Sequence, residues 1–194
     1  MTTDPRCPWC LATAQYQHYH DHEWGVPTFD DQKLFEFLIL EGAQAGLSWR
    51  TVLEKRAGYA RAFHNFDPAR VAAMSDAELE ALTQNSGIIR NKLKINSARH
   101  NARAFLKVQQ EHGNFARYLW AYVDGNPITN HFKSLSEVPV RTELSDQISN
   151  DLKRRGFKFV GSTIIYAYLQ AMGLVNDHLI HCPRHRACTE HRGC

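Results

Sequence analysis

The sequence lacks the features that mark membrane, secreted and disordered proteins. None of its 194 residues lies in an uninterrupted apolar run approaching the ~18 residues that a membrane span needs. The first five residues have neither a basic start nor an apolar stretch, so we expect a cytoplasmic protein without a secretory signal. Hydrophobic residues make up 43% and charged residues 22%, a composition that excludes intrinsic disorder.

An excess of charge of one sign is also missing. The 23 Lys and Arg residues face 20 Asp and Glu residues, which leaves a formal net charge of +3. This excess is too small to predict a nucleic-acid partner and too small to exclude one. Sustained alternation of apolar and polar residues, internal repeats and low-complexity segments are absent too, so a sheet is not expected.

Helical periodicity fills most of the chain instead. Apolar residues recur at helical spacing from Asp31, Ser48 can cap a helix running to about Phe63, and Ser75 opens a capping box. Further helices are expected from Pro68, from Asn91 and over 115–123, 145–155 and 162–172. We therefore predict an all-α protein that forms a single unit over 1–194, with room for two helical lobes.

Cysteine occurs only near the two ends of the chain, which also contains 11 histidines. Without a signal peptide, such residues predict metal ligands before disulfides, and thiolate with imidazole favours a closed, four-ligand zinc site. Spacing leaves the ligands open: Cys7 with Cys10, or Cys7 with His20, facing His178 and Cys182. The alternative is a set of free thiols and surface histidines. We favour one structural zinc ion that joins the termini.

The last part of the chain has almost no apolar residues with which to form a core. We expect residues 183–194, with Cys188 and Cys194, to form a loosely ordered tail.

An aromatic cluster lies close to an unusual carboxylate. Glu41 directly follows an apolar run at the end of a helix that otherwise points into the core. A carboxylate there is solvated, paired or held for a ligand. Together with the flat faces of Tyr16, Tyr19 and Trp24, it suits a planar ligand that carries N–H donors or positive charge. The alternative is a surface Glu beside aromatic residues that only pack.

A second candidate site is the connection between two expected helices around Gly87. A tight glycine turn followed by Arg90, Lys92 and Lys94 places backbone N–H groups and basic side chains where phosphates can bind. Alone this pattern is weak, because such turns are common and such charges are usually solvated.

Several segments together resemble one family, the 3-methyladenine DNA glycosylase I family. The matching segments occur in family order between residues 7 and 182: YHDHEWGVP (19–27), LEGAQAGLSW (40–49), FHNFDP (63–68), GIIR (87–90), RGFKFVG (155–161) and GLVNDH (173–178).

This resemblance implies a helix-hairpin-helix enzyme of DNA base excision repair that binds alkylated double-stranded DNA, flips out 3-methyladenine and releases it by hydrolysis without strand cleavage. By position, the family's structural zinc ligands are Cys7, His20, His178 and Cys182. The implied base pocket consists of Glu41, Trp49, Tyr16, Tyr19 and Trp24, and the hairpin with Gly87, Arg90 and Lys92 anchors phosphate. Leu47, with Gln44, is the candidate to fill the gap left by the extruded base.

Other points stay open at this level. We assign no general base and no lysine nucleophile, and we expect a monomer that does not bind membranes. Competing hypotheses are a zinc-stabilised, non-catalytic binder of DNA or methylated bases and a zinc hydrolase with a metal-bound water. Cys10, Cys188 and Cys194 lie outside the matched pattern.

Overall fold

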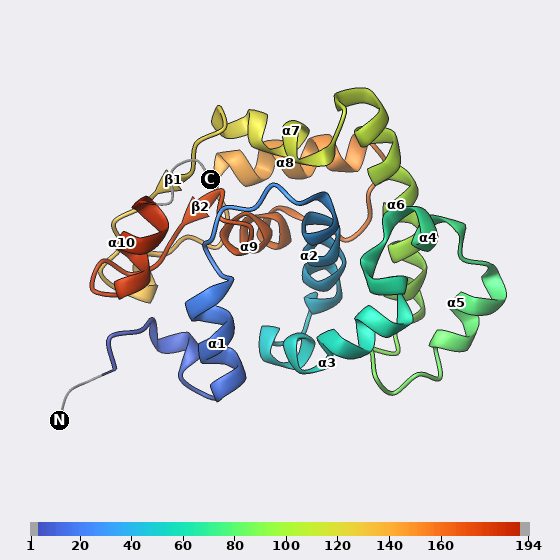
Figure 1. Ribbon diagram of the computed structural model, residues 1–194, viewed down its shortest axis with the longest axis horizontal. Coiled ribbons are helices and arrows are strands. Elements are labelled where there is room, and N and C mark those ends of the chain that lie inside the picture. The colour runs from blue at the N-terminus through green and yellow to red at the C-terminus, as the bar shows by residue number, and fades with distance from the viewer. Residues whose placement is uncertain (1–3, 191–194) are drawn as a thin grey trace.

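The computed structural model describes residues 4–190 (Figure 1). The α-helices of this range are α1 (Ala14–His22), α2 (Asp31–Gln44), α3 (Trp49–Ala62), α4 (Pro68–Ala73), α5 (Asp76–Leu82), α6 (Lys92–His112), α7 (Phe115–Trp120), α8 (Glu143–Arg154), α9 (Ser162–Ala171) and α10 (Pro183–Glu190). Short 3₁₀ turns are η1 (Pro8–Cys10), η2 (His64–Phe66), η3 (Ala121–Val123) and η4 (Leu135–Glu137). The prediction of a mainly helical protein is confirmed.

Local capping signals explain where several helices begin. The Ser48 side chain accepts a hydrogen bond from the Thr51 amide at the start of α3. Ser75 and Glu78 form the expected capping box of α5. None of the helices between residues 4 and 190 is both long and apolar enough to cross a bilayer.

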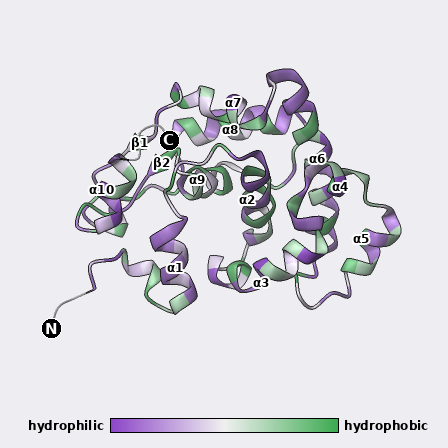
Figure 2. Cartoon of the chain, in the orientation of Figure 1, coloured by the Kyte–Doolittle hydropathy of each residue, from purple (hydrophilic) through white to green (hydrophobic). Residues whose placement is uncertain are grey.

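Helix α2 lies at the centre of the molecule (Figure 1) and contacts α3, α6, α7 and α9. Its buried residues run continuously from Phe37 to Ala43, and apolar colour covers much of α2 and α9 (Figure 2). Because neighbours surround this helix, residues 37–43 are buried whether they are apolar or polar. Glu41 is therefore only 3% exposed.

A two-stranded parallel sheet is a small departure from the all-α prediction. Strands β1 (Ile128–Thr129) and β2 (Val175–Asn176) pair Ile128 with Val175 and Thr129 with Asn176. Two residues are too few to produce a visible alternation in the sequence. The pairing fixes the segment that leads directly to His178.

The described end of the chain is helical rather than loosely ordered. Helix α10 covers Pro183–Glu190, and its Cys188 is 2% exposed. Asn176 Nδ2 donates to the His185 carbonyl at 2.9 Å and to Thr189 Oγ1 at 3.1 Å, so the helix is held by polar contacts and not by an apolar stripe. The expectation for 183–190 was wrong for this reason. Cys194 lies outside the described residues.

Candidate metal centre and aromatic pocket

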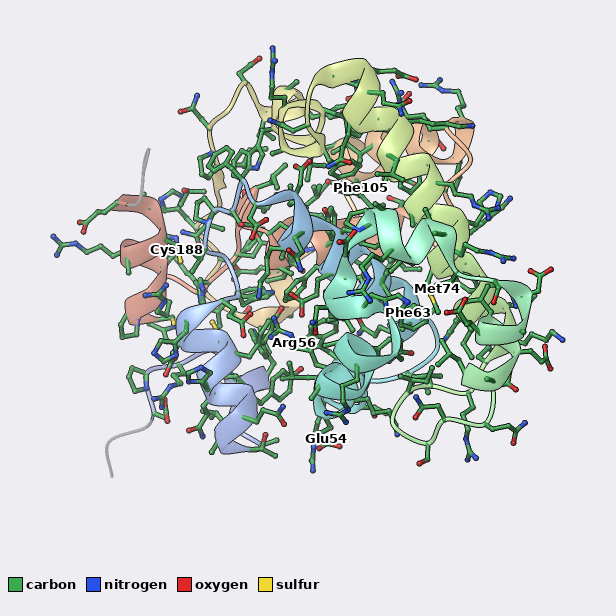
Figure 3. All side chains as sticks on the ribbon, turned by 45° about the vertical axis from the view of Figure 1, so that its right-hand side comes forward. Glu54, Arg56, Phe63, Met74, Phe105 and Cys188 are labelled. Carbon is green, nitrogen blue, oxygen red and sulfur yellow. The ribbon has the colours of Figure 1, made fainter. Side chains whose placement is uncertain are left out.

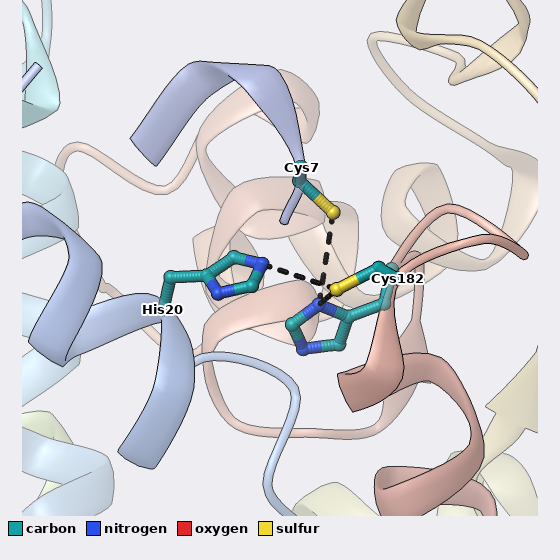
Figure 4. A group of neighbouring side chains, drawn as sticks. Cys7, His20 and Cys182 are labelled. Atoms are coloured by element: carbon teal, nitrogen blue, oxygen red, sulfur yellow. Dashed lines mark hydrogen bonds between the residues drawn. The ribbon is translucent and has the colours of Figure 1, made fainter. Parts of the chain in front are cut away.

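Four side chains from the two ends of the chain meet in a buried cluster (Figure 4). The donor atoms of Cys7, His20, His178 and Cys182 all lie within 4.8 Å of one another. Cys182 Sγ is 3.6 Å from His20 Nε2 and 3.7 Å from His178 Nδ1, and Cys7 Sγ is 3.8 Å from His178 Nδ1. Sulfur and nitrogen ligands of one tetrahedral zinc ion are separated by about 3.5 Å, so the cluster can hold a metal ion.

The other atoms of these ligands have partners that fix their orientation. His20 Nδ1 lies 2.8 Å from Asp21 Oδ1, and His178 Nε2 lies 3.0 Å from the Trp24 carbonyl. Burial lowers the pKa of His178, which keeps the ring neutral as ligation requires. Outer partners of this kind orient ligand histidines in metal sites.

The two sulfurs also behave as a pair. Hydrogen bonding between them lowers the pKa of Cys182 and raises that of Cys7. A pair of one thiolate and one thiol can bind a cation once the thiol has also released its proton.

Cys10 is not part of the cluster. Its thiol donates to the Cys7 carbonyl at 3.2 Å, and burial raises its pKa to about 11. Cys188 lies on α10 (Figure 3), where burial raises its pKa and Arg184 is its hydrogen-bond donor at 3.6 Å. The structure therefore brings His20, and not Cys10, together with Cys7, His178 and Cys182.

A cavity of about 210 Å³ lies beside this cluster. All five predicted pocket residues line it: Tyr16, Tyr19, Trp24, Glu41 and Trp49. Tyr16 and Tyr19 are three residues apart on α1 and so share a face, Glu41 belongs to α2, and Trp49 is the first residue of α3. The Tyr19 and Trp49 ring centroids are 5.5 Å apart. The structure thus brings the predicted residues together.

Two buried polar atoms of this pocket have no hydrogen-bond partner among the described residues: Glu41 Oε2 and Trp49 Nε1. Burial raises the pKa of Glu41 to about 8 and that of Tyr16 to about 12. A carboxyl group kept from water and from donors is expensive in a folded protein. It is the arrangement expected of a group reserved for a ligand.

An ion-pair network holds α3, and with it Trp49, against α1 and α2. Arg56 donates to both oxygens of Glu23 at 2.8 and 2.9 Å and to Glu36 at 2.6 Å. Its guanidinium lies 5.2 Å from the Phe37 ring centroid. Arg56 points into the molecule, whereas Glu54 of the same helix points outward (Figure 3). These contacts fix the wall of the pocket opposite α1.

The sequence interpretation missed part of the lining. Trp9, Leu135, Val138, Ala167, Gln170 and Asp177 also line the cavity. Asp177 is 2% exposed and accepts hydrogen bonds from Asn130, Tyr166 and Gln170 at 2.5–2.8 Å. Trp9 lies two residues after the predicted ligand Cys7, and this closeness was the one available signal.

Aromatic contacts connect the pocket with the metal cluster. The Trp9 ring lies 5.2 Å from the His20 ring, and the Trp24 ring lies 4.6 Å from the His178 ring. A metal that orders these histidines therefore also orders two walls of the pocket.

The predicted hairpin joins α5 to α6 and packs directly on α3. A Cβ atom on Gly58 would lie 2.0 Å from the Gly87 carbonyl oxygen, so only glycine fits there. Lys55 donates to the Ser86 carbonyl at 2.7 Å, and Tyr59 Oη accepts from the Ile89 amide at 3.2 Å. The turn is thus held rigidly against α3, with Arg90 and Lys92 at the surface.

These basic residues have different surroundings. Arg90 is exposed and has no ion pair among residues 4–190, while Lys92 pairs with Glu80 at 2.7 Å. Lys94 is half-buried, and its ammonium points to backbone instead of into the solvent: it donates to the Ala43 and Ala45 carbonyls at 2.8 and 2.6 Å. The expectation of a phosphate-facing Lys94 was wrong.

The segment after α2 presents the two candidate gap-filling residues. Gln44 lines the main cavity and a neighbouring one of about 200 Å³, which Leu47 also lines. Leu47 is 42% exposed. Both candidates thus lie at the edge of the pocket.

Comparisons with known proteins agree with this geometry. The sequence model of the methyladenine glycosylase family matches residues 9–185. The chain belongs to this family. It is 50% identical over 183 residues to the DNA-3-methyladenine glycosylase of Haemophilus influenzae, covering 94% of this chain and 98% of that one. It is also 50% identical over 177 residues to DNA-3-methyladenine glycosylase 1 of Escherichia coli, covering 91% and 95%.

A solved structure extends the similarity to three dimensions. The crystal structure of a variant of 3-methyladenine DNA glycosylase I in complex with 3-methyladenine superimposes with a TM-score of 0.90 at 36% identity, covering 93% of this chain and 97% of that one. The predicted family is confirmed, and with it the prediction of a glycosylase, an enzyme that hydrolyses N-glycosyl bonds.

Proposed function

We propose that this enzyme flips 3-methyladenine out of alkylated double-stranded DNA and releases it by hydrolysis, without cleaving the strand. The observation that carries the proposal is the buried, unpartnered carboxyl group of Glu41 in an aromatic cavity. The names of the two relatives and the ligand of the solved structure support the choice of base.

The pocket suits a positively charged, planar base. Methylation of adenine at the ring nitrogen that faces the minor groove makes the base cationic and weakens its bond to the sugar. Glu41 as a carboxylate accepts hydrogen bonds from the edge of the base, while the faces of Trp49 and Tyr19 stack on the cationic ring. Neutral adenine offers no charge to offset the burial of Glu41, so the pocket discriminates against it.

The reaction needs little acid or base chemistry from the protein. The C1′–N9 bond breaks with its electron pair going to the base, which leaves as neutral 3-methyladenine. Water then adds its oxygen to C1′ and loses a proton. No lysine lines the described cavity, which supports hydrolysis without a covalent lysine intermediate.

The DNA is held on both sides of the lesion. Arg90, Lys92 and the turn at Gly87 bind phosphate at the exposed start of α6, where the Asn91 side chain caps only the Lys94 amide. Leu47, with Gln44, fills the space that the base leaves, which offsets part of the few kcal/mol that extrusion costs.

We further propose that the metal is zinc, one ion per chain, held by Cys7, His20, His178 and Cys182. Four protein ligands leave no open position for a catalytic water, so its contribution is structural. The helix-hairpin-helix assignment, the single unit, the monomeric state and the cytoplasmic location stay predictions.

The experiment is incubation of alkylated duplex DNA with wild type, Glu41→Gln and the control Glu54→Gln, whose side chain is 51% exposed. Chromatography identifies the released bases. We expect free 3-methyladenine from wild type and the control, and about hundredfold slower release from Glu41→Gln, the loss typical of one preorganised electrostatic contact. No free 3-methyladenine from wild type would contradict the proposed function. Equal release by all three proteins would remove only the role of Glu41.

A further inference from the structure

Lys94 connects two parts of the molecule that are far apart in sequence. It belongs to the first turn of α6, directly after the hairpin, and its ammonium reaches the C-terminal end of α2. There it donates to the Ala43 carbonyl at 2.8 Å and to the Ala45 carbonyl at 2.6 Å. Carbonyls at a helix C-terminus lack helical partners and carry negative partial charge, so an ammonium group binds them well.

The segment that Lys94 holds belongs to the proposed site. Glu41 and Gln44 of α2 line both cavities, and the chain then turns through Gly46, whose φ of +77° is the left-handed region. The Leu47 amide donates to the Gln44 carbonyl at 2.6 Å and closes this turn. The Leu47 side chain is 42% exposed. The ammonium thus binds the carbonyls on both sides of Gln44, directly before the turn that presents Leu47.

The other end of this connection is rigid. The hairpin is fixed to α3 because Gly58 leaves no room between the two backbones and because Lys55 binds the Ser86 carbonyl. The Asn91 side chain accepts from the Lys94 amide and caps α6 at the same residue. The hairpin, the start of α6 and the Lys94 backbone therefore form one unit that is fixed to α3.

We propose that Lys94 is a positioning residue that sets the place of Leu47 and Gln44 relative to the hairpin. This inference rests on the proposed function. When the hairpin binds phosphate, the Lys94 contacts place the segment 44–48 at a fixed distance from the backbone of the DNA. Leu47 then enters the base stack at the lesion. The free base is still received by Glu41, Trp49 and Tyr19, because the Lys94 ammonium bonds only to the Ala43 and Ala45 carbonyls among the described residues.

The test compares wild type, Lys94→Met, Lys94→Arg and the control Lys107→Met. Methionine keeps an unbranched apolar stem as long as that of lysine to Cε but has no ammonium donor, and Lys107 is an exposed lysine farther along the same helix. Three quantities are measured for each protein: the single-turnover rate of 3-methyladenine release from duplex DNA, the affinity for free 3-methyladenine, and the melting temperature.

We expect Lys94→Met to slow release from duplex DNA by about tenfold to hundredfold, the cost of a small misplacement of a working group. Its affinity for the free base stays within about twofold of wild type, Lys94→Arg recovers most of the rate, and Lys107→Met matches wild type. A role in stability alone predicts parallel losses in all three measurements.

Two results overturn the inference while the proposed function stands. One is a release rate of Lys94→Met equal to that of Lys107→Met. The other is a loss of free-base affinity as large as the loss of rate. A wild-type protein that releases no 3-methyladenine overturns the proposed function and this inference with it.

Discussion

The metal cluster and the aromatic pocket lie side by side but differ in whether their buried polar atoms have partners. In the cluster, each ring nitrogen of His20 and His178 faces a sulfur, a carboxylate or a carbonyl at 2.8–3.8 Å. In the pocket, Glu41 Oε2 and Trp49 Nε1 are buried without a partner among residues 4–190.

This difference is the one expected between a region that stabilises the fold and one that is kept for a ligand. Each unmet buried polar group costs about 1–3 kcal/mol, more when it is charged. The pocket retains such groups, and the neighbouring cluster holds its walls through Trp9 and Trp24. A metal ion bound in the cluster would therefore stabilise the walls of a pocket whose own unpaired polar groups are destabilising.

The largest expected effect comes from breaking the metal cluster. Cys182→Ser removes a thiolate from a buried four-donor set, and structural zinc sites contribute on the order of 10 kcal/mol to folding, as much as the whole stability of a typical domain. We expect elemental analysis to find no bound zinc, and the melting temperature to fall by more than about 10 °C or the protein to be insoluble.

The matched control for this change is Cys10→Ser. Its hydroxyl can still donate to the Cys7 carbonyl that the Cys10 thiol binds. We expect one zinc ion per chain and a nearly unchanged melting temperature. Loss of zinc from this control, or full zinc content in Cys182→Ser, would show that the ligand set is wrong.

In the pocket, Glu41→Gln has the opposite effect on stability. Burial raises the pKa of Glu41 to about 8, against about 4.3 in an unfolded chain. The native state thus binds the proton more tightly than the unfolded state. The resulting stability is fully present below about pH 4.3 and is lost as the pH rises through about 8.

Because glutamine does not titrate, Glu41→Gln gains stability relative to wild type over this range. We expect its melting temperature to exceed that of wild type by about 5 °C more at pH 8.5 than at pH 5, although the same variant loses activity. Glu54→Gln provides the baseline. If the difference in melting temperature between Glu41→Gln and wild type is the same at pH 5 and pH 8.5, the pKa of Glu41 is not raised by burial.

Contacts between residues that are close in the sequence could be predicted from it, and contacts between distant residues could not. Ser48 and Ser75 act on amides three residues away, so their capping roles follow from spacing alone. The choice between Cys10 and His20 depends on the path of the chain between residues 7 and 182. The resemblance to a family gave the His20 choice, and residue spacing did not.

Lys94 shows that the partner of a charged side chain cannot be predicted from the sequence either. Neighbouring basic residues look alike in a sequence, yet Lys92 meets Glu80 at the surface and Lys94 reaches carbonyls of another helix. Asp177 was missed because nothing near it in the sequence indicates that Asn130 and Tyr166 converge on it. A helical pattern predicts on which side of its helix a residue lies. Which residue it contacts depends on how the helices pack.

The smallest expected effect tests the unmet donor of Trp49. Trp49→Phe and Trp120→Phe remove the same atoms from two buried tryptophans, which are 9% and 3% exposed. Trp120 Nε1 donates to the Thr28 carbonyl at 2.8 Å, whereas Trp49 Nε1 has no partner in the described part of the chain. Phenylalanine at 120 therefore leaves a carbonyl unsatisfied, and phenylalanine at 49 removes an unsatisfied N–H.

Both changes leave a smaller ring in a packed region, so that cost is shared and the difference isolates the hydrogen bond. We expect Trp49→Phe to be less destabilising than Trp120→Phe by about 2 kcal/mol in denaturant unfolding at neutral pH. Equal losses would mean that the Trp49 N–H is already satisfied in the free protein. The contrast with the metal cluster would then rest on Glu41 alone.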